Sequence, residues 1–219
     1  MRLRSVRLSA AKRRHARGRV FRRRVGRASF KLFLSGTKPV AGFGAEVTGL
    51  PEPGLNSLRT MAVSHVCGSA RKSRTAALLL HGDPTVDLAC AASRRWAREC
   101  WRSDLSTLAM SRSQLADAYY KLIKAPSVSG WKGIRGPLSA ATLELGRFGW
   151  TWPHPTHFRD HAGRLWDLCG TSPARLLELF KESHAYRLGL QLGDRPEAVG
   201  LGCGTAVGLP VDPPPIQKL

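Results

Sequence analysis

The 219-residue sequence has no uninterrupted run of 18 apolar residues, so no segment is long enough for a membrane-spanning helix. Its five cysteines are an odd number without a CxxC pair, which argues against a disulfide scaffold or a zinc ribbon. A reduced intracellular compartment, nuclear or cytoplasmic, is the simplest expectation. Phosphate-loop, GxSxG and adjacent-aspartate motifs are also missing, so the sequence predicts neither a cofactor nor enzymatic activity.

Acidic residues are absent from the start of the chain, and the first is Glu46. Residues 1–30 carry 12 of the 35 Lys and Arg residues, and the formal net charge of the chain is +20. A basic arm of this kind indicates a nucleic-acid partner, because each cation that meets a phosphate releases a counterion. Three other interpretations stay open: a solvated tail, an Arg-rich mitochondrial targeting peptide, or a coding bias toward arginine.

Helical geometry gives the arm a defined face. On a continuous helix, five basic residues fall within about 40° of one line: Arg13, Arg17, Arg24, Arg27 and Lys31. An apolar line lies roughly 90° away and contains Phe21, Val25, Ala28 and Leu32. Gly18 and Gly26 each cost about 1 kcal/mol relative to Ala, so this helix needs the apolar line as a packing surface. The sequence therefore predicts a nucleic-acid-binding helix that ends at Pro39.

The rest of the chain predicts a mainly α protein of small helical lobes with one β-hairpin, whose turn is at Gly163. We divide it into a basic arm and helix (1–50), a helical lobe (51–125), a helix–hairpin–helix lobe (126–192) and a disordered tail (193–219).

Helix boundaries are marked by capping residues. Ser73 is expected to cap a short helix that Gly82 ends, and Asp83 to cap the next one, with Asp87 in its first turn. This capping pattern competes with a metal or acid–base role for the two aspartates. Trp96 continues the apolar stripe of the following helix, which favours a core position over a base-stacking role.

One group of residues has zinc-ligand chemistry: His154, His157, His161 and Cys169. The prolines at 153 and 155 prevent these histidines from sharing a helical face, and no second close pair completes a finger. We therefore predict no metal here and keep a zinc-dependent interaction module as an alternative function.

Three stretches, in order, resemble the region that follows the catalytic palm in LINE-like, non-LTR retrotransposon reverse transcriptases. The first runs from 31 to 49 and has Phe33, Pro39, Phe43, Gly44 and Glu46 at the family's Leu-x-Pro and Tyr-Gly-x-Glu steps, with Phe43 in place of Tyr. The second contains Leu58-Arg59, the segment 79–84 and the segment 96–101. The third runs from 136 to 150 and continues through the Gly163 hairpin and the Ser172-Pro173 helix start.

This resemblance covers residues 15–190 and implies a thumb and connector without fingers, palm or catalytic aspartates. Such a fragment would grip a template–primer duplex by its backbone without catalysing synthesis. The sequence thus predicts sequence-independent nucleic-acid binding by a non-catalytic reverse transcriptase fragment. A stand-alone basic RNA-binding protein, in an organelle if the arm is a targeting peptide, is the alternative.

Overall fold

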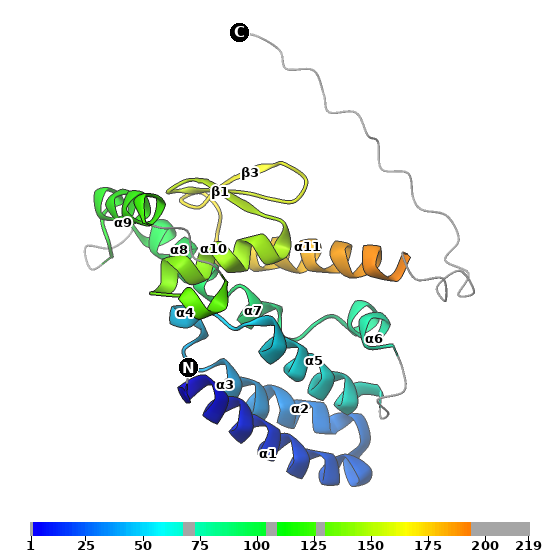
Figure 1. The fold of residues 1–219 in the computed structure, drawn as a ribbon. Helices are drawn as coiled ribbons and strands as arrows, with labels where there is room; N and C mark the ends of the chain where they lie inside the picture. The colour runs from blue at the N-terminus through cyan, green and yellow to red at the C-terminus, as the bar shows by residue number, and fades with distance from the viewer. Residues whose placement is uncertain (1, 68–72, 104–108, 126–129, 194–219) are drawn as a thin grey trace.

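The computed structural model describes residues 2–67, 73–103, 109–125 and 130–193, with side chains from residue 5 onward. The predicted mainly α class is confirmed (Figure 1). The predicted disordered tail, apart from Gly193, lies outside the described residues. No described helix is both long and apolar enough to cross a membrane.

The elements follow one another in chain order. The α-helices are α1 (Arg2–Val25), α2 (Phe30–Leu32), α3 (Lys38–Gly42), α4 (Ala45–Thr48), α5 (Glu52–Cys67), α6 (Arg74–His81), α7 (Val86–Ala89), α8 (Ala91–Arg102), α9 (Arg112–Lys124), α10 (Pro137–Phe148) and α11 (Pro173–Gly193). Two 3-10 segments are η1 (Gly26–Ser29) and η3 (Trp131–Gly133), and η2 (Phe33–Thr37) is a π-helical turn. The strands β1 (Thr151–His154), β2 (His157–Arg159) and β3 (Leu165–Asp167) form an antiparallel sheet in the order β1-β2-β3.

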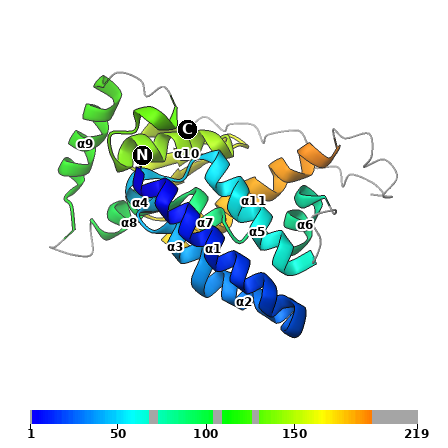
Figure 2. The same ribbon diagram turned by 60° about the horizontal axis from the view of Figure 1, so that its bottom comes forward.

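The basic arm is a helical hairpin and not the single helix that we predicted. The helix α1 ends at Val25, and Gly26 follows with a φ of 58°, in the left-handed region that glycine adopts most readily. The chain then reverses through η1, and the run from α2 to α3 packs back along α1 (Figures 1 and 2). Gly26, which the prediction counted as a tolerated helix interior, is thus the turn.

Pro39 does not end the returning helix, so that prediction was wrong as well. The π-helical turn η2 precedes α3, and Pro39 occupies the first turn of α3, where a missing N–H leaves few hydrogen bonds unmade. The helix continues to Gly42, and Phe43 then leaves it in an extended conformation with a ψ of 123°.

The predicted apolar line is not the packing surface of α1. Phe21 is 57% exposed, Val25 is 48% exposed and Leu32 is 47% exposed. The hairpin instead packs through Ala11 and Phe33, both fully buried. The reversal at Gly26 explains this difference, because the predicted line assumed one helix from residue 13 to residue 32.

The caps around α6 are confirmed, but the role of Asp83 is different. The Ser73 side chain accepts a hydrogen bond from the Ala76 amide, and Gly82 ends α6 with a φ of 74°. Thr85, not Asp83, is the residue before α7, whose first turn contains Asp87 as predicted. Asp83 instead accepts hydrogen bonds from the Thr85 amide and hydroxyl at 2.8 and 2.7 Å.

The predicted hairpin at Gly163 is confirmed as the β2–β3 connection, where Gly163 has a φ of 82°. The buried carboxylate of Asp160 accepts hydrogen bonds from the amides of Ala162 and Arg164, both at 2.9 Å, which fixes this turn. The strand β1 adds a third strand, which we did not predict because Pro153 and Pro155 interrupt the pattern of this segment.

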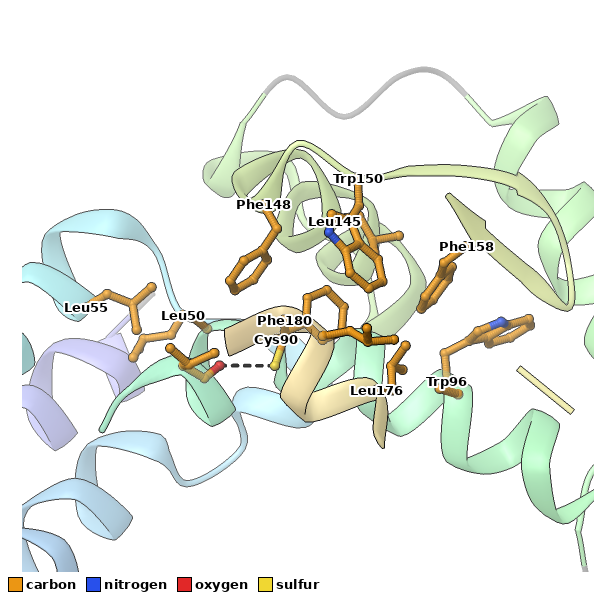
Figure 3. Packing of buried hydrophobic residues seen from close by; sticks show 14 of the residues in the cluster. Leu50, Leu55, Cys90, Trp96, Leu145, Phe148, Trp150, Phe158, Leu176 and Phe180 are labelled. Atoms are coloured by element: carbon orange, nitrogen blue, oxygen red, sulfur yellow. Dashed lines mark hydrogen bonds between the residues drawn. The ribbon is translucent and has the colours of Figure 1, made fainter. Parts of the chain in front are cut away.

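The core is aromatic and lies where α8, α10, α11 and the sheet meet (Figure 3). Trp150 stacks on Phe180 with ring centroids 4.3 Å apart, and its indole donates to Ser183 Oγ at 2.8 Å. Trp96 is buried and donates to the Pro155 carbonyl at 2.8 Å, which confirms its core position. The same buried cluster includes Ala11 and Phe33 from the arm, so the hairpin shares its core with the body.

Candidate nucleic-acid interface

A groove of about 980 Å³ lies between α1 and α5, and basic side chains form one of its walls. This wall, on α1, contains Lys12, His15, Arg19, Arg22 and Arg23. The opposite wall, on α5, is polar and contains Asn56, Ser57, Thr60 and Ser64. Arg74 of α6 adds a further cation and donates to Thr60 Oγ1 at 3.3 Å. We call this feature the basic groove.

The spacing of these residues explains why they share a groove. Positions 12, 15, 19 and 22 on α1 recur every three or four residues, and so do positions 53, 57, 60 and 64 on α5, so each set lies on one helical face. Small residues bring the two helices together. Gly18 is buried, and a Cβ at this position would lie 3.1 Å from His65 Cε1.

Within the part of the chain that the structure describes, no acidic side chain neutralises the charges of the basic groove. No carboxylate lines the groove, and within the described residues no ion pair joins an α1 cation to an acidic side chain. The Arg22 Nε is buried and has no hydrogen-bond partner there. An external anion is therefore the group that best complements this wall.

A chain of hydrogen bonds leads from the groove into the hairpin. His15 Nδ1 lies 3.1 Å from His65 Nε2, and His65 Nδ1 lies 3.1 Å from Ser29 Oγ, which donates onward to the Gly26 carbonyl at 2.9 Å. Because the Ser29 proton is used in that bond, Ser29 accepts from His65, and His65 in turn accepts from His15. These hydrogen bonds join α1, α5 and the Gly26 turn.

His15 and His65, the two histidines in this series of hydrogen bonds, favour the neutral form. Burial, together with the neighbouring His65 and Arg19, lowers the pKa of His15 to about 4. Burial also lowers the pKa of His65, with Arg22 and Arg19 acting in the same direction. The neutral imidazoles supply the acceptor and donor atoms that the hydrogen-bond chain needs.

The five predicted contact residues are only partly brought together. Arg13, Arg17 and Arg24 are exposed on α1, whereas Arg27 lies in η1 and Lys31 in α2, beyond the turn at Gly26. None of the five lines the basic groove. These residues share one face only on a continuous helix. Because the chain reverses at Gly26, they do not form a single face.

The sequence contained a signal for the residues that we missed. The α1 wall could be found with the same helical geometry, because Lys12, Arg19, Arg22 and Arg23 share a face in every helix that includes them. The contribution of α5 and of Arg74 could not be found in this way, because it depends on how α1 packs.

The four candidate zinc ligands are not assembled in one place. His154 and His157 are adjacent across the β1–β2 connection, with their Nδ1 atoms 3.3 Å apart. His161 Nδ1 instead lies 2.9 Å from Ser183 Oγ. Among the described residues, no group of three or more His, Cys, Asp or Glu side chains, with or without Cys169, has a geometry that would hold a metal ion.

Asp83 belongs to a buried ion pair and not to an acid–base site. Its Oδ2 lies 2.6 Å from Arg59 Nε and 2.8 Å from His184 Nε2, and its side chain is fully buried. Burial alone raises the pKa of Asp83, but the hydrogen bond to His184 and the charge of Arg59 outweigh burial and lower it well below the ordinary value. The carboxylate thus stays charged and joins α5 to α11.

Comparisons with family models, with curated proteins and with solved structures give no match for this chain. The resemblance to reverse transcriptases therefore stays a prediction.

Proposed function

We propose that this protein binds nucleic acid through the phosphate backbone, without reading its sequence, and that the basic groove is the main contact. The observation that carries the proposal is a wall of cations with no carboxylate among the residues that line the groove. Phosphate oxygens accept strong hydrogen bonds from such donors and release counterions on binding.

The composition of the groove favours phosphate contacts over base contacts. His15 is its only aromatic side chain, so it lacks the Phe, Tyr or Trp surfaces on which bases stack in many single-strand binding sites. Lys and Arg contacts to phosphate position a protein on nucleic acid and carry no sequence information. Binding of similar strength to unrelated sequences is the expected result.

The resemblance to reverse transcriptases supports the same class of partner and extends the proposal to a non-catalytic fragment of a retroelement enzyme. No adjacent aspartate pair is present in the sequence. We expect that the purified protein does not extend a primed template with Mg²⁺ or Mn²⁺. Primer extension that persists after contaminating polymerases have been removed would contradict this part of the proposal.

A salt titration tests the interface. The groove variant replaces Lys12, Arg19, Arg23 and Arg74 by Gln, which removes charge and keeps good helix formers. Losing four phosphate contacts should make the slope of log affinity against log salt shallower by about 3.6 on B-form duplex and about 2.8 on single strands. The titration uses two unrelated duplexes and one single strand.

Two further variants locate the effect. The first replaces the predicted residues Arg13, Arg17, Arg24, Arg27 and Lys31 by Gln, and we expect a smaller change than in the groove variant. The second replaces four exposed cations of the body, Arg102, Lys124, Lys132 and Arg159, which changes the net charge by the same amount as the groove variant. If the groove variant keeps the wild-type slope of log affinity against log salt, the basic groove is not the main contact with nucleic acid. A loss confined to one sequence would indicate base recognition and refute the backbone mode.

A further inference from the structure

A second groove, of about 670 Å³, lies between α9 and α10, and its lining is mainly apolar. Leu122 of α9, Leu138 and Leu143 of α10, and Trp152 of β1 are among its lining residues. Ile123, also in the lining, is 59% exposed. None of the lining residues belongs to α1, α5 or α6, so this apolar groove is separate from the basic groove.

The walls of the apolar groove are held in place by the core. Leu115 and Tyr119 of α9 are 0% and 3% exposed, and the Tyr119 hydroxyl donates to the Trp152 carbonyl at 2.9 Å. The groove-lining residues Ala118 and Leu122 are one turn apart on α9, and Leu138 and Thr142 are one turn apart on α10. Rows of side chains at this spacing on two helices can accept the ridges of a third helix.

The charge around the groove selects the kind of helix. Lys121 and Arg135 are the charged residues in its lining, and no carboxylate accompanies them. A second copy of this chain is a poor occupant, because its formal net charge of +20 would oppose these cations. A helix with an apolar stripe flanked by Asp or Glu complements both the apolar surface and the charge.

We propose that the apolar groove binds an amphipathic, acidic helix of a partner protein. The apolar side chains of this helix would lie against Leu122, Leu138 and Leu143, and its carboxylates would pair with Lys121 and Arg135. In Figures 1 and 2, α9 lies at one edge of the molecule, where a partner can approach it. This proposal does not depend on nucleic-acid binding, and its test contains no nucleic acid.

The probe is a fluorescent peptide of about four helical turns, with Leu at i, i+3, i+4 and i+7 and Glu on both flanks of that stripe. One control peptide replaces every Glu by Lys, and a second has the acidic composition in scrambled order. Anisotropy should show saturable binding of the acidic amphipathic peptide alone. Amide chemical-shift changes should map to residues 118–125 and 138–143 of the full chain.

Two protein variants test the assignment of the groove. Ile123→Glu places a charge on the apolar surface and should weaken binding at least about tenfold. The double variant Lys121→Glu/Arg135→Glu should weaken the acidic peptide about tenfold and strengthen the basic one, since the charge preference reverses. Matched controls are Leu80→Glu, at a residue 79% exposed on α6, and Arg13→Glu/Arg24→Glu on α1, and both should bind like wild type.

Several outcomes would refute the proposal. Equal binding of the acidic and scrambled peptides would mean that no helical stripe is recognised, and equal loss in the α1 control would mean that net charge alone drives binding. Absence of saturable binding up to millimolar peptide refutes the acidic-helix occupant, and so does complete displacement of the peptide by dodecanoate, which would indicate a small-amphiphile site. If Ile123→Glu fails to fold by circular dichroism, the charge-reversal variant decides.

Discussion

Two buried arginines of the body and three exposed arginines of α1 use their charges in opposite ways. In the body, Arg59 and Arg147 are largely buried and pair with Asp83 and Glu52, so their charges join elements within the fold. On α1, Arg13, Arg17 and Arg19 are exposed and have no acidic partner among the described residues. Phe180 of the core and Phe21 on the outer surface of α1 differ in the same way, since the first is buried and the second is exposed.

This contrast indicates where stability and binding reside. Removing a buried side chain from the body should cost folding free energy, whereas removing one from the outer surface of α1 should affect binding and leave the fold intact. The following experiments test that separation.

The largest effect is expected for a pair of phenylalanines. Phe180→Ala removes a fully buried ring that contacts Phe148 and Trp150, and should lower the free energy of unfolding by about 3–5 kcal/mol. Phe21→Ala, at a residue 57% exposed, should change it by less than about 0.5 kcal/mol. Urea unfolding of both variants measures the difference. Equal losses would show that the hairpin is as tightly packed as the body.

The buried ion pair should have the next largest effect. Asp83→Asn leaves Arg59 without its closest carboxylate and should cost about 3 kcal/mol of unfolding free energy. Because the pKa of Asp83 is lowered, its contribution is present above the ordinary Asp value and is lost as the pH falls below that value. Asp117→Asn, at an exposed residue of α9, is the matched control and should be neutral within about 0.5 kcal/mol.

Glu144 should give the body a pH dependence of the opposite sign. Burial raises the pKa of Glu144 to about 7, although the amides of Ser93 and Ala92 and the charge of Arg147 oppose that rise. The folded carboxyl therefore keeps its proton where the unfolded one has lost it, and stability should fall by up to about 3 kcal/mol between pH 4.5 and pH 7. Glu144→Gln should remove this slope in urea unfolding. A slope unchanged by the substitution would contradict the role of Glu144.

His15 should give the hairpin a smaller pH dependence. Its pKa is lowered to about 4, so the unfolded state takes up a proton first as the pH falls. The contribution of His15 to the free energy of unfolding is fully present above pH 6.5. It should decrease by about 1–2 kcal/mol toward pH 4, after allowance for solvent screening. His15→Gln keeps a hydrogen-bond donor and an acceptor, and it should make stability less dependent on pH between pH 6.5 and pH 4. Amide hydrogen exchange of α1 follows the change locally, and the exchange rates of α10 serve as the control.

Local sequence signals predicted the fold class and several boundaries. Ser73, Gly82 and the Gly163 turn were identified correctly because caps and turns depend on a few neighbouring residues. The hairpin reversal was missed because a glycine such as Gly26 is compatible both with the interior of a helix, at some cost in stability, and with the end of a helix. Asp83 was assigned to a cap because its partners Arg59 and His184 are 24 and 101 residues away in sequence.

The basic groove is lined by residues of the arm other than the five predicted from the sequence. The excess of positive charge in residues 1–30 indicated a polyanion partner from composition alone. Which arginines act together depends on the packing of α1 against α5, and the buried Gly18 that permits it has no separate signature in the sequence. The predicted division of the chain into four segments stays a prediction.

Cross-linking of the unmodified protein tests most directly whether the hairpin meets the polyanion while the body holds the fold together. Single-stranded oligonucleotides of two unrelated sequences, each carrying photoreactive 5-iodouridine throughout, are irradiated with the protein at low salt, and the linked peptides are identified by mass spectrometry. We expect that both oligonucleotides link mainly to residues 12–26 and 53–64, the two walls of the basic groove. Cross-links concentrated in α8, α10 or α11, or in different places for the two sequences, would contradict it.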